Sequence, residues 1–119
     1  MARSAYSGTA ISVRTGRDTE YEIFARVTRR LRQAQVGEGG FVALVRALHE
    51  NRSLWTALAA DVAVESNALP KPLRARIFYL AQFTAEHSRR VMAGAATVDV
   101  LIDINTAIMR GLRGEGEWA

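Results

Sequence analysis

Few residues in this sequence could do chemistry, and they do not form a recognisable catalytic group. The two histidines, His49 and His87, are far apart in the chain and share no metal-ligand spacing, and there are no cysteines. Asp61 is a single carboxylate, and the sequence contains no glycine-rich phosphate loop, HExxH motif or nucleophile elbow. We therefore expect a protein that is not an enzyme and that holds no cofactor or metal ion.

Basic residues give the chain a net charge of +4 but are scattered along it. Three short groups could contact phosphates, at residues 29–32, 74–76 and 89–90. Phe78 and Tyr79 lie near the second group, but helical geometry makes such aromatics mainly core residues and not a base-stacking surface. The pattern favours a solvated basic surface, and direct RNA binding is not expected.

Composition indicates one soluble domain. The chain has 119 residues, of which 49% are hydrophobic. The lack of cysteine favours a reducing compartment, the first residues lack signal-peptide character, and no apolar run approaches the ~20 residues that span a bilayer. We expect a cytoplasmic protein with a flexible or extended arm over residues 1–17, one helical domain over 18–112 and a flexible tail over 113–119.

Residues 51–80 predict two helices folded back on each other, around which the remaining chain is organised. Apolar residues recur every three or four positions on both sides of a proline-bearing connector. Pro70 disfavours a helical conformation at Leu69, so one helix must end before it, and Pro70 suits the first position of the next helix. Asn67 can turn or cap the chain at this connector.

Similar periodicity predicts further helices, from Asp18 to the glycines at 37–40 and from about 97 to 112. The stretch from about 41 to 64 is either one helix or two. Its heptad-like seam consists of Phe41, Leu48, Trp55 and Val62, interleaved with Leu44, Asn51 and Leu58. We predict an all-α fold, a small bundle of about four to five mostly antiparallel helices with an irregular N-terminal arm.

Polar residues within the apolar stripes need partners. The Trp55 indole N–H must be hydrogen-bonded if it is buried, and Asp61 could meet an arginine across the connector. Asn105 is either a register-setting core residue or a contact to a partner. We interpret one group of residues as a structural clamp on the helical hairpin: Trp55, Asp61, Asn67, Pro70 and Arg74.

At these residues the chain resembles the FlaF flagellar biosynthesis regulators. The resemblance covers roughly residues 18–112, and Lys71-Pro72 departs from the family's pattern. It rests on the order and spacing of several short segments: Leu54-Trp55-Thr56, Asp61, Asn67-Ala68-Leu69-Pro70, Leu73-Arg74-Ala75, Asp18-Thr19-Glu20-Tyr21 and the run from Leu101 to Leu112.

The resemblance implies a helical, non-enzymatic protein of flagellum assembly that acts on flagellin together with the regulator FlbT. It implies an export chaperone that binds flagellin and promotes its production or secretion. Two alternatives stay open: an adaptor that binds FlbT and reaches flagellin through it, and a post-transcriptional regulator that binds flagellin mRNA.

A flagellin chaperone would need an apolar groove, because the terminal amphipathic helices of flagellin are unpaired before the filament assembles. The helix at 70–93 has an apolar face wider than a small core requires. We therefore expect a groove beside the helices at 70–93 and 97–112, with five candidate partner-binding residues: Phe78, Phe83, Ile102, Asn105 and Met109.

Overall fold

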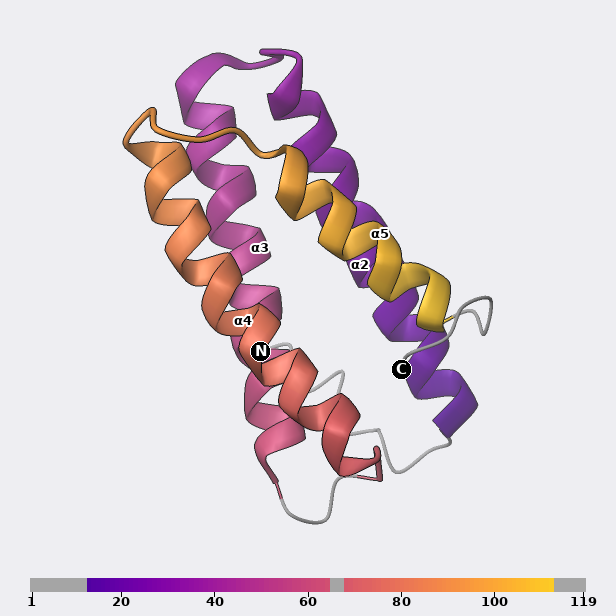
Figure 1. Ribbon diagram of the computed structural model, residues 1–119. Helices are drawn as coiled ribbons and strands as arrows, with labels where there is room; N and C mark the ends of the chain where they lie inside the picture. Colours follow the sequence, from indigo (N-terminus) through magenta and orange to yellow (C-terminus); the bar gives the residue numbers. More distant parts are fainter. Residues whose placement is uncertain (1–12, 65–67, 113–119) are drawn as a thin grey trace.

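The computed structural model describes residues 13–64 and 68–112. Within these ranges the chain forms four α-helices: α2 (Val13–Gln35), α3 (Gly40–Ala63), α4 (Lys71–Met92) and α5 (Asp99–Leu112) (Figure 1). The prediction of a small all-α bundle is confirmed. The stretch that was either one helix or two is a single helix, α3, because nothing in it breaks the hydrogen-bonded backbone.

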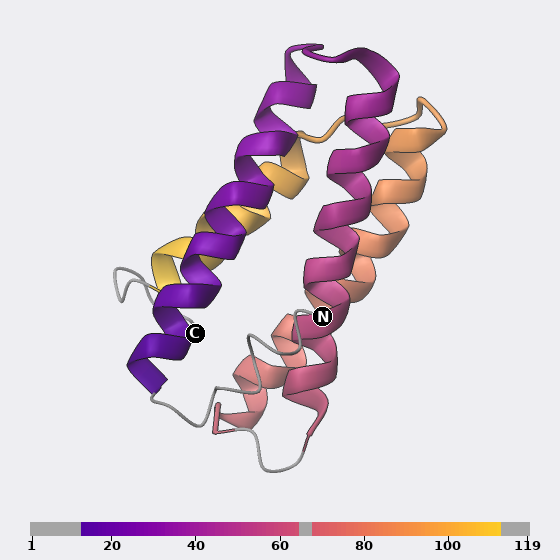
Figure 2. The same cartoon turned by 180° about the vertical axis from the view of Figure 1, so that it is seen from behind.

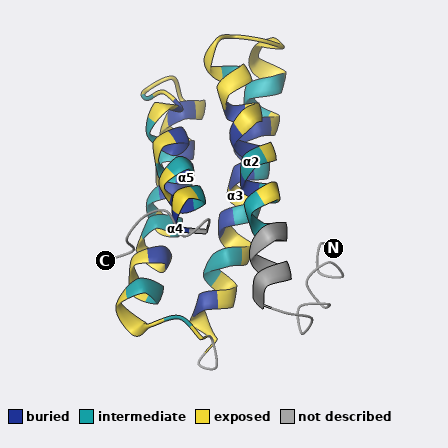
Figure 3. Ribbon diagram, turned by 90° about the vertical axis from the view of Figure 1, so that its right-hand side faces the viewer, coloured by how far each residue is buried: buried dark blue, intermediate teal, exposed yellow. Residues whose placement is uncertain are grey.

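Successive helices run antiparallel, and α5 returns beside α2 (Figures 1 and 2). Close backbone contact joins three pairs, α3–α4, α2–α3 and α2–α5. The pair α4–α5 is not among them, so the bundle is closed along three of its edges and looser along the fourth. Burial follows this arrangement, with buried residues on the faces that the helices turn toward one another (Figure 3).

Helix boundaries agree with the local signals to within two residues except at the N-terminus. Pro70 was predicted at the first position of its helix, but that helix begins one residue later, at Lys71. Pro70 is the N-cap of α4, and its carbonyl oxygen accepts hydrogen bonds from the backbone N–H of Leu73 and Arg74 at 3.1 and 3.0 Å. The first helix was expected to begin at Asp18 after an irregular arm. It begins instead at Val13, since residues 13–17 contain no proline and a single glycine costs a helix only about 1 kcal/mol. Residues 1–12 lie outside the described ranges.

Two hydrophobic clusters fill the bundle. One lies near the α2–α3 loop and is built around Leu31, Leu48 and Leu101, while the other is built around Phe24 and Trp55. Phe41 was expected to join the seam of α3 but is 63% exposed. It lies in the first turn of α3, where the helices end and offer it few neighbours.

The α2–α3 loop depends on glycine. Gly39 has a φ of 84°, in the left-handed region, and a Cβ built on it would lie 2.6 Å from the Cβ of Ala43. Gly37 has a similar φ of 81° but open space around it. We expect Gly39→Ala to lower the free energy of unfolding by about 2–3 kcal/mol, through backbone strain and the clash together.

The matched control is Gly37→Ala, which carries the backbone strain alone and should cost about 1 kcal/mol. Urea denaturation followed by circular dichroism measures both values. Equal costs at the two positions would show that the contact with Ala43 does not matter.

Candidate partner-binding surface

A buried polar network ties three helices together at the middle of the bundle. The Asn105 side chain accepts a hydrogen bond from Trp55 Nε1 at 2.9 Å and donates to Asn51 Oδ1 at 2.8 Å and Thr28 Oγ1 at 3.1 Å. Asn51, Thr28 and Asn105 are all fully buried. Phe24 meets the Trp55 ring edge-on, with ring centroids 5.8 Å apart. Asn105 therefore fixes how α5 registers against α2 and α3, which agrees with the first of its two interpretations.

The residues interpreted as a clamp divide between two places. Arg74 does join the two halves of the hairpin, since its Nε donates to the backbone oxygen of Val62 at 3.0 Å. Trp55 instead points into the core, toward Asn105 on α5. Asp61 is exposed near the end of α3, and Asn67 lies outside the described residues.

The two phenylalanines expected to share a groove lie on opposite flanks of α4. They are five residues apart, which places them roughly 140° apart around a helix. Phe78 follows Arg74 by one turn, on the flank that reaches α3. Phe83 stacks on His87, with centroids 5.5 Å apart, and His87 Nε2 lies 2.8 Å from the backbone oxygen of Thr97 in the α4–α5 connector. Phe83 therefore faces α5, whereas Phe78 does not.

The expected groove residues of α5 are mostly interior. Ile102 is only 7% exposed and Asn105 is fully buried, so neither offers a surface to a partner. Met109 is half-buried against the second cluster. The error arises because these residues lie on the stripe that α5 buries, and an apolar stripe alone does not distinguish core from contact surface.

Two further apolar residues of α5, Val100 and Ile104, lie away from the flank turned toward α2, and each packs against one of the core clusters. Thr106 accepts a hydrogen bond from Arg32 of α2 at 3.4 Å, so Thr106 lies on the flank of α5 that is turned toward α2. Ile104 and Val100 lie roughly 160° and 120° away from Thr106 around the helix, and both are half-buried. A signal for them was present in the sequence, because the apolar residues of α5 are too many for one stripe.

We call the surface formed by Leu80 and Phe83 of α4 and Val100 and Ile104 of α5 the α4–α5 edge. All four side chains are half-buried and apolar, and they lie on the side of the bundle where neighbouring helices of the described ranges make the sparsest backbone contact. In the described part of the chain no group of three or more His, Asp or Glu could hold a metal ion. No helix there is long and apolar enough to cross a membrane.

A four-helix bundle with a hydrogen-bonded polar network in its core places the described part of the chain in the class of small all-α proteins. Comparison with known families narrows this class. The family model described as flagellar protein FlaF matches residues 2–112, and the chain belongs to the FlaF family. No curated protein and no solved structure matches the chain. Family membership makes this a flagellar protein, as the sequence resemblance indicated.

Proposed function

We propose that this protein binds flagellin in the cytoplasm as an export chaperone, acting with FlbT, and that one amphipathic flagellin helix lies along the α4–α5 edge. The observation that carries the proposal is the pairing of half-buried apolar side chains on the facing flanks of α4 and α5 with the sparse backbone contact between these helices. A helix laid there would bury its apolar stripe and complete the fourth side of the bundle.

The dimensions of the edge limit the length of helix that it can hold. α5 has 14 residues and is therefore about 21 Å long, which matches about four turns of a bound helix. Such a helix would present apolar residues at every third or fourth position. Covering that stripe would keep an unassembled subunit from associating through it, which is the physical task of an export chaperone.

The decisive comparison uses the two flanks of α4. We expect Phe83→Glu to weaken binding of purified monomeric flagellin about 100-fold or more, because it places a carboxylate against an apolar helix. Phe78→Glu is the matched control, with the same chemical change on the flank facing away from α5. It should bind flagellin as the wild type does.

Calorimetric titration without FlbT measures both affinities, and a negative heat-capacity change would indicate apolar burial. Circular dichroism verifies that each variant is folded. Loss of binding in Phe78→Glu with retention in Phe83→Glu would move the site to the α3–α4 side. If folded wild-type protein gave no binding at any temperature, the adaptor function would be favoured, and the same titration with FlbT added would test it.

A further inference from the structure

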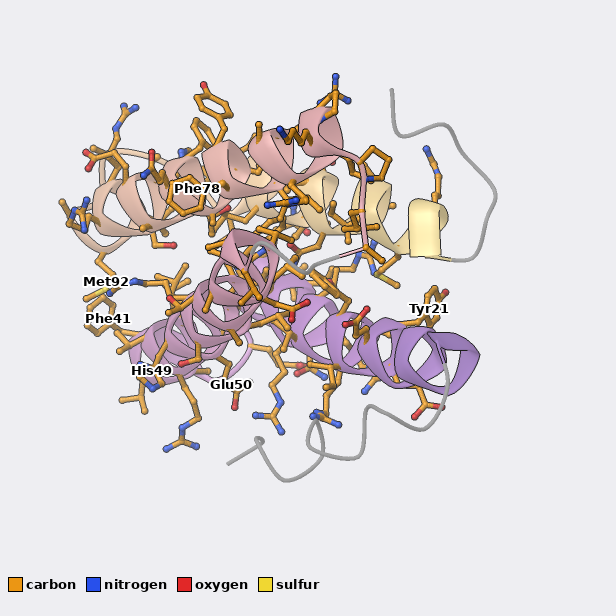
Figure 4. All side chains as sticks on the ribbon, turned by 90° about the horizontal axis from the view of Figure 1, so that it is seen from below. Tyr21, Phe41, His49, Glu50, Phe78 and Met92 are labelled. Carbon is orange, nitrogen blue, oxygen red and sulfur yellow. The ribbon has the colours of Figure 1, made fainter. Side chains whose placement is uncertain are left out.

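A second apolar surface lies at the end of the bundle beside the α2–α3 loop. Of the seven large hydrophobic side chains that are exposed in the described ranges, four gather there. Three of these, Phe41, Val42 and Met92, form together with half-buried Val45 what we call the tip patch. Figure 4 shows Phe41 and Met92 next to each other where the start of α3 meets the end of α4, and Figure 1 places these two helix ends together.

The tip patch is separate from the α4–α5 edge. Met92 lies fourteen residues after Phe78, which returns it to nearly the same flank of α4, the flank facing α3. A partner on one surface therefore leaves the other accessible, and the tip patch needs an occupant of its own.

The chemistry of the tip patch limits what that occupant can be. Phe41, Val42 and Val45 line a shallow depression whose remaining walls are Arg46 and His49. Neither Arg46 nor His49 makes an ion pair with an acidic residue in the described part of the chain. The depression therefore suits a large apolar side chain that has carboxylates beside it.

The C-terminal residues of this chain carry that combination. Residues 113–119 read RGEGEWA, with Glu117 immediately before Trp118 and Glu115 three positions before it. Tryptophan is among the side chains that are enriched at the energetic centres of interfaces, where they fill well-packed pockets. The other terminal segment, residues 1–12, contains Arg3 and no acidic residue, so charge favours the tail.

A molecule's own tail cannot reach its own tip patch. α5 starts at the patch end of the bundle and runs about 21 Å away from it over its 14 residues. The six residues from Leu112 to Trp118 span at most about 21 Å when fully extended. The patch lies on α3 and the end of α4, across a bundle that is 26 Å wide, so the extended tail falls short of the combined axial and lateral separation.

We propose that the acidic, tryptophan-bearing tail of one molecule docks on the tip patch of a second copy, so that the protein associates head to tail. Such contacts are heterologous, because one molecule contributes its tail and the other its patch. An open assembly then has an unused patch at one end and an unused tail at the other, unless the chain of contacts closes into a ring. The α4–α5 edge takes no part, so this inference stands or falls independently of flagellin binding.

Sedimentation velocity over a concentration series, with full-length protein, tests the proposal. The wild type should show a weight-average mass that rises with concentration and falls again as salt is raised. Trp118→Ala removes the anchor and Val42→Glu puts a carboxylate in the patch. Each should weaken self-association about tenfold or more. Tyr79→Glu, on an equally exposed face of α4, is the control and should associate as the wild type does.

Mixing the two variants separates this arrangement from a symmetric dimer. Trp118→Ala retains an intact patch and Val42→Glu an intact tail, so an equimolar mixture should form a complex of one copy of each. A wild type that stays monomeric, a Trp118→Ala variant that associates normally, or a mixture without complex would each overturn the proposal. Circular dichroism confirms folding. Trp118 is not one of the residues that build the described helices, so its variant tests the proposal independently of Val42.

Discussion

Replacing Trp55 with alanine is expected to lower the free energy of unfolding by about 4 kcal/mol, a large part of the 5–15 kcal/mol typical of a domain. The side chain is 1% exposed and packs edge-on against Phe24 in the second cluster. Its removal leaves a large cavity, and the Asn105 oxygen that accepts the indole N–H loses its partner. Urea denaturation followed by circular dichroism measures the effect.

Trp55→Phe separates the two contributions. Phenylalanine retains most of the ring contact but cannot donate a hydrogen bond, so its cost should be about 1–2 kcal/mol. If the two substitutions cost the same, the hydrogen bond to Asn105 would outweigh the packing. A loss under about 1 kcal/mol for Trp55→Ala would contradict the buried position of the indole.

Asn105→Asp should be the most damaging substitution of nearly unchanged shape, costing about 3–5 kcal/mol at pH 7.5. The Asn105 amide nitrogen donates to Asn51 and Thr28. A carboxylate at this position would place two acceptor oxygens in a fully buried site. One of these oxygens must face the Asn51 oxygen. The resulting repulsion and the loss of hydration both act against the folded state.

This penalty should depend on pH in a defined direction. Burial raises the folded-state pKa of the introduced carboxyl group above its ordinary value of about 3.9. The folded state therefore holds the proton to higher pH than the unfolded state does. The stability of the variant relative to wild type falls as the pH rises through the interval between the unfolded-state pKa and the folded-state pKa. Near pH 4 the protonated group can donate to Asn51 as the amide does, and most of the penalty should disappear.

Asn51→Asp is the matched control for the Asn105 experiment. The amide nitrogen of Asn51 has no hydrogen-bond partner among the described residues, and only its oxygen is used. A carboxylate there would bury a charge but lose no donor, so the cost should be smaller than at position 105. Urea unfolding of both variants and wild type at pH 4 and 7.5 measures the difference, and a pH-independent cost at position 105 would contradict the network.

The sequence determined the elements of this protein because their signals are local. Pro70 and the glycines at 37–40 set helix ends through backbone conformation alone, and the repeats of apolar residues predicted the helices and the all-α class. Family membership was likewise visible in short segments and their spacing. The start of α2 was misplaced because helix signals at that end are weak.

Only the tertiary structure decided which polar and aromatic residues meet. Trp55 and Asn105 lie fifty positions apart, and their pairing depends on α5 returning beside α2. Phe78 and Phe83 belong to the same broad apolar face in the sequence, but neighbouring helices place them on opposite flanks. Periodicity shows that a helix has an apolar face, yet which flank is covered depends on the positions of its neighbours, and these arise from contacts distant in the chain.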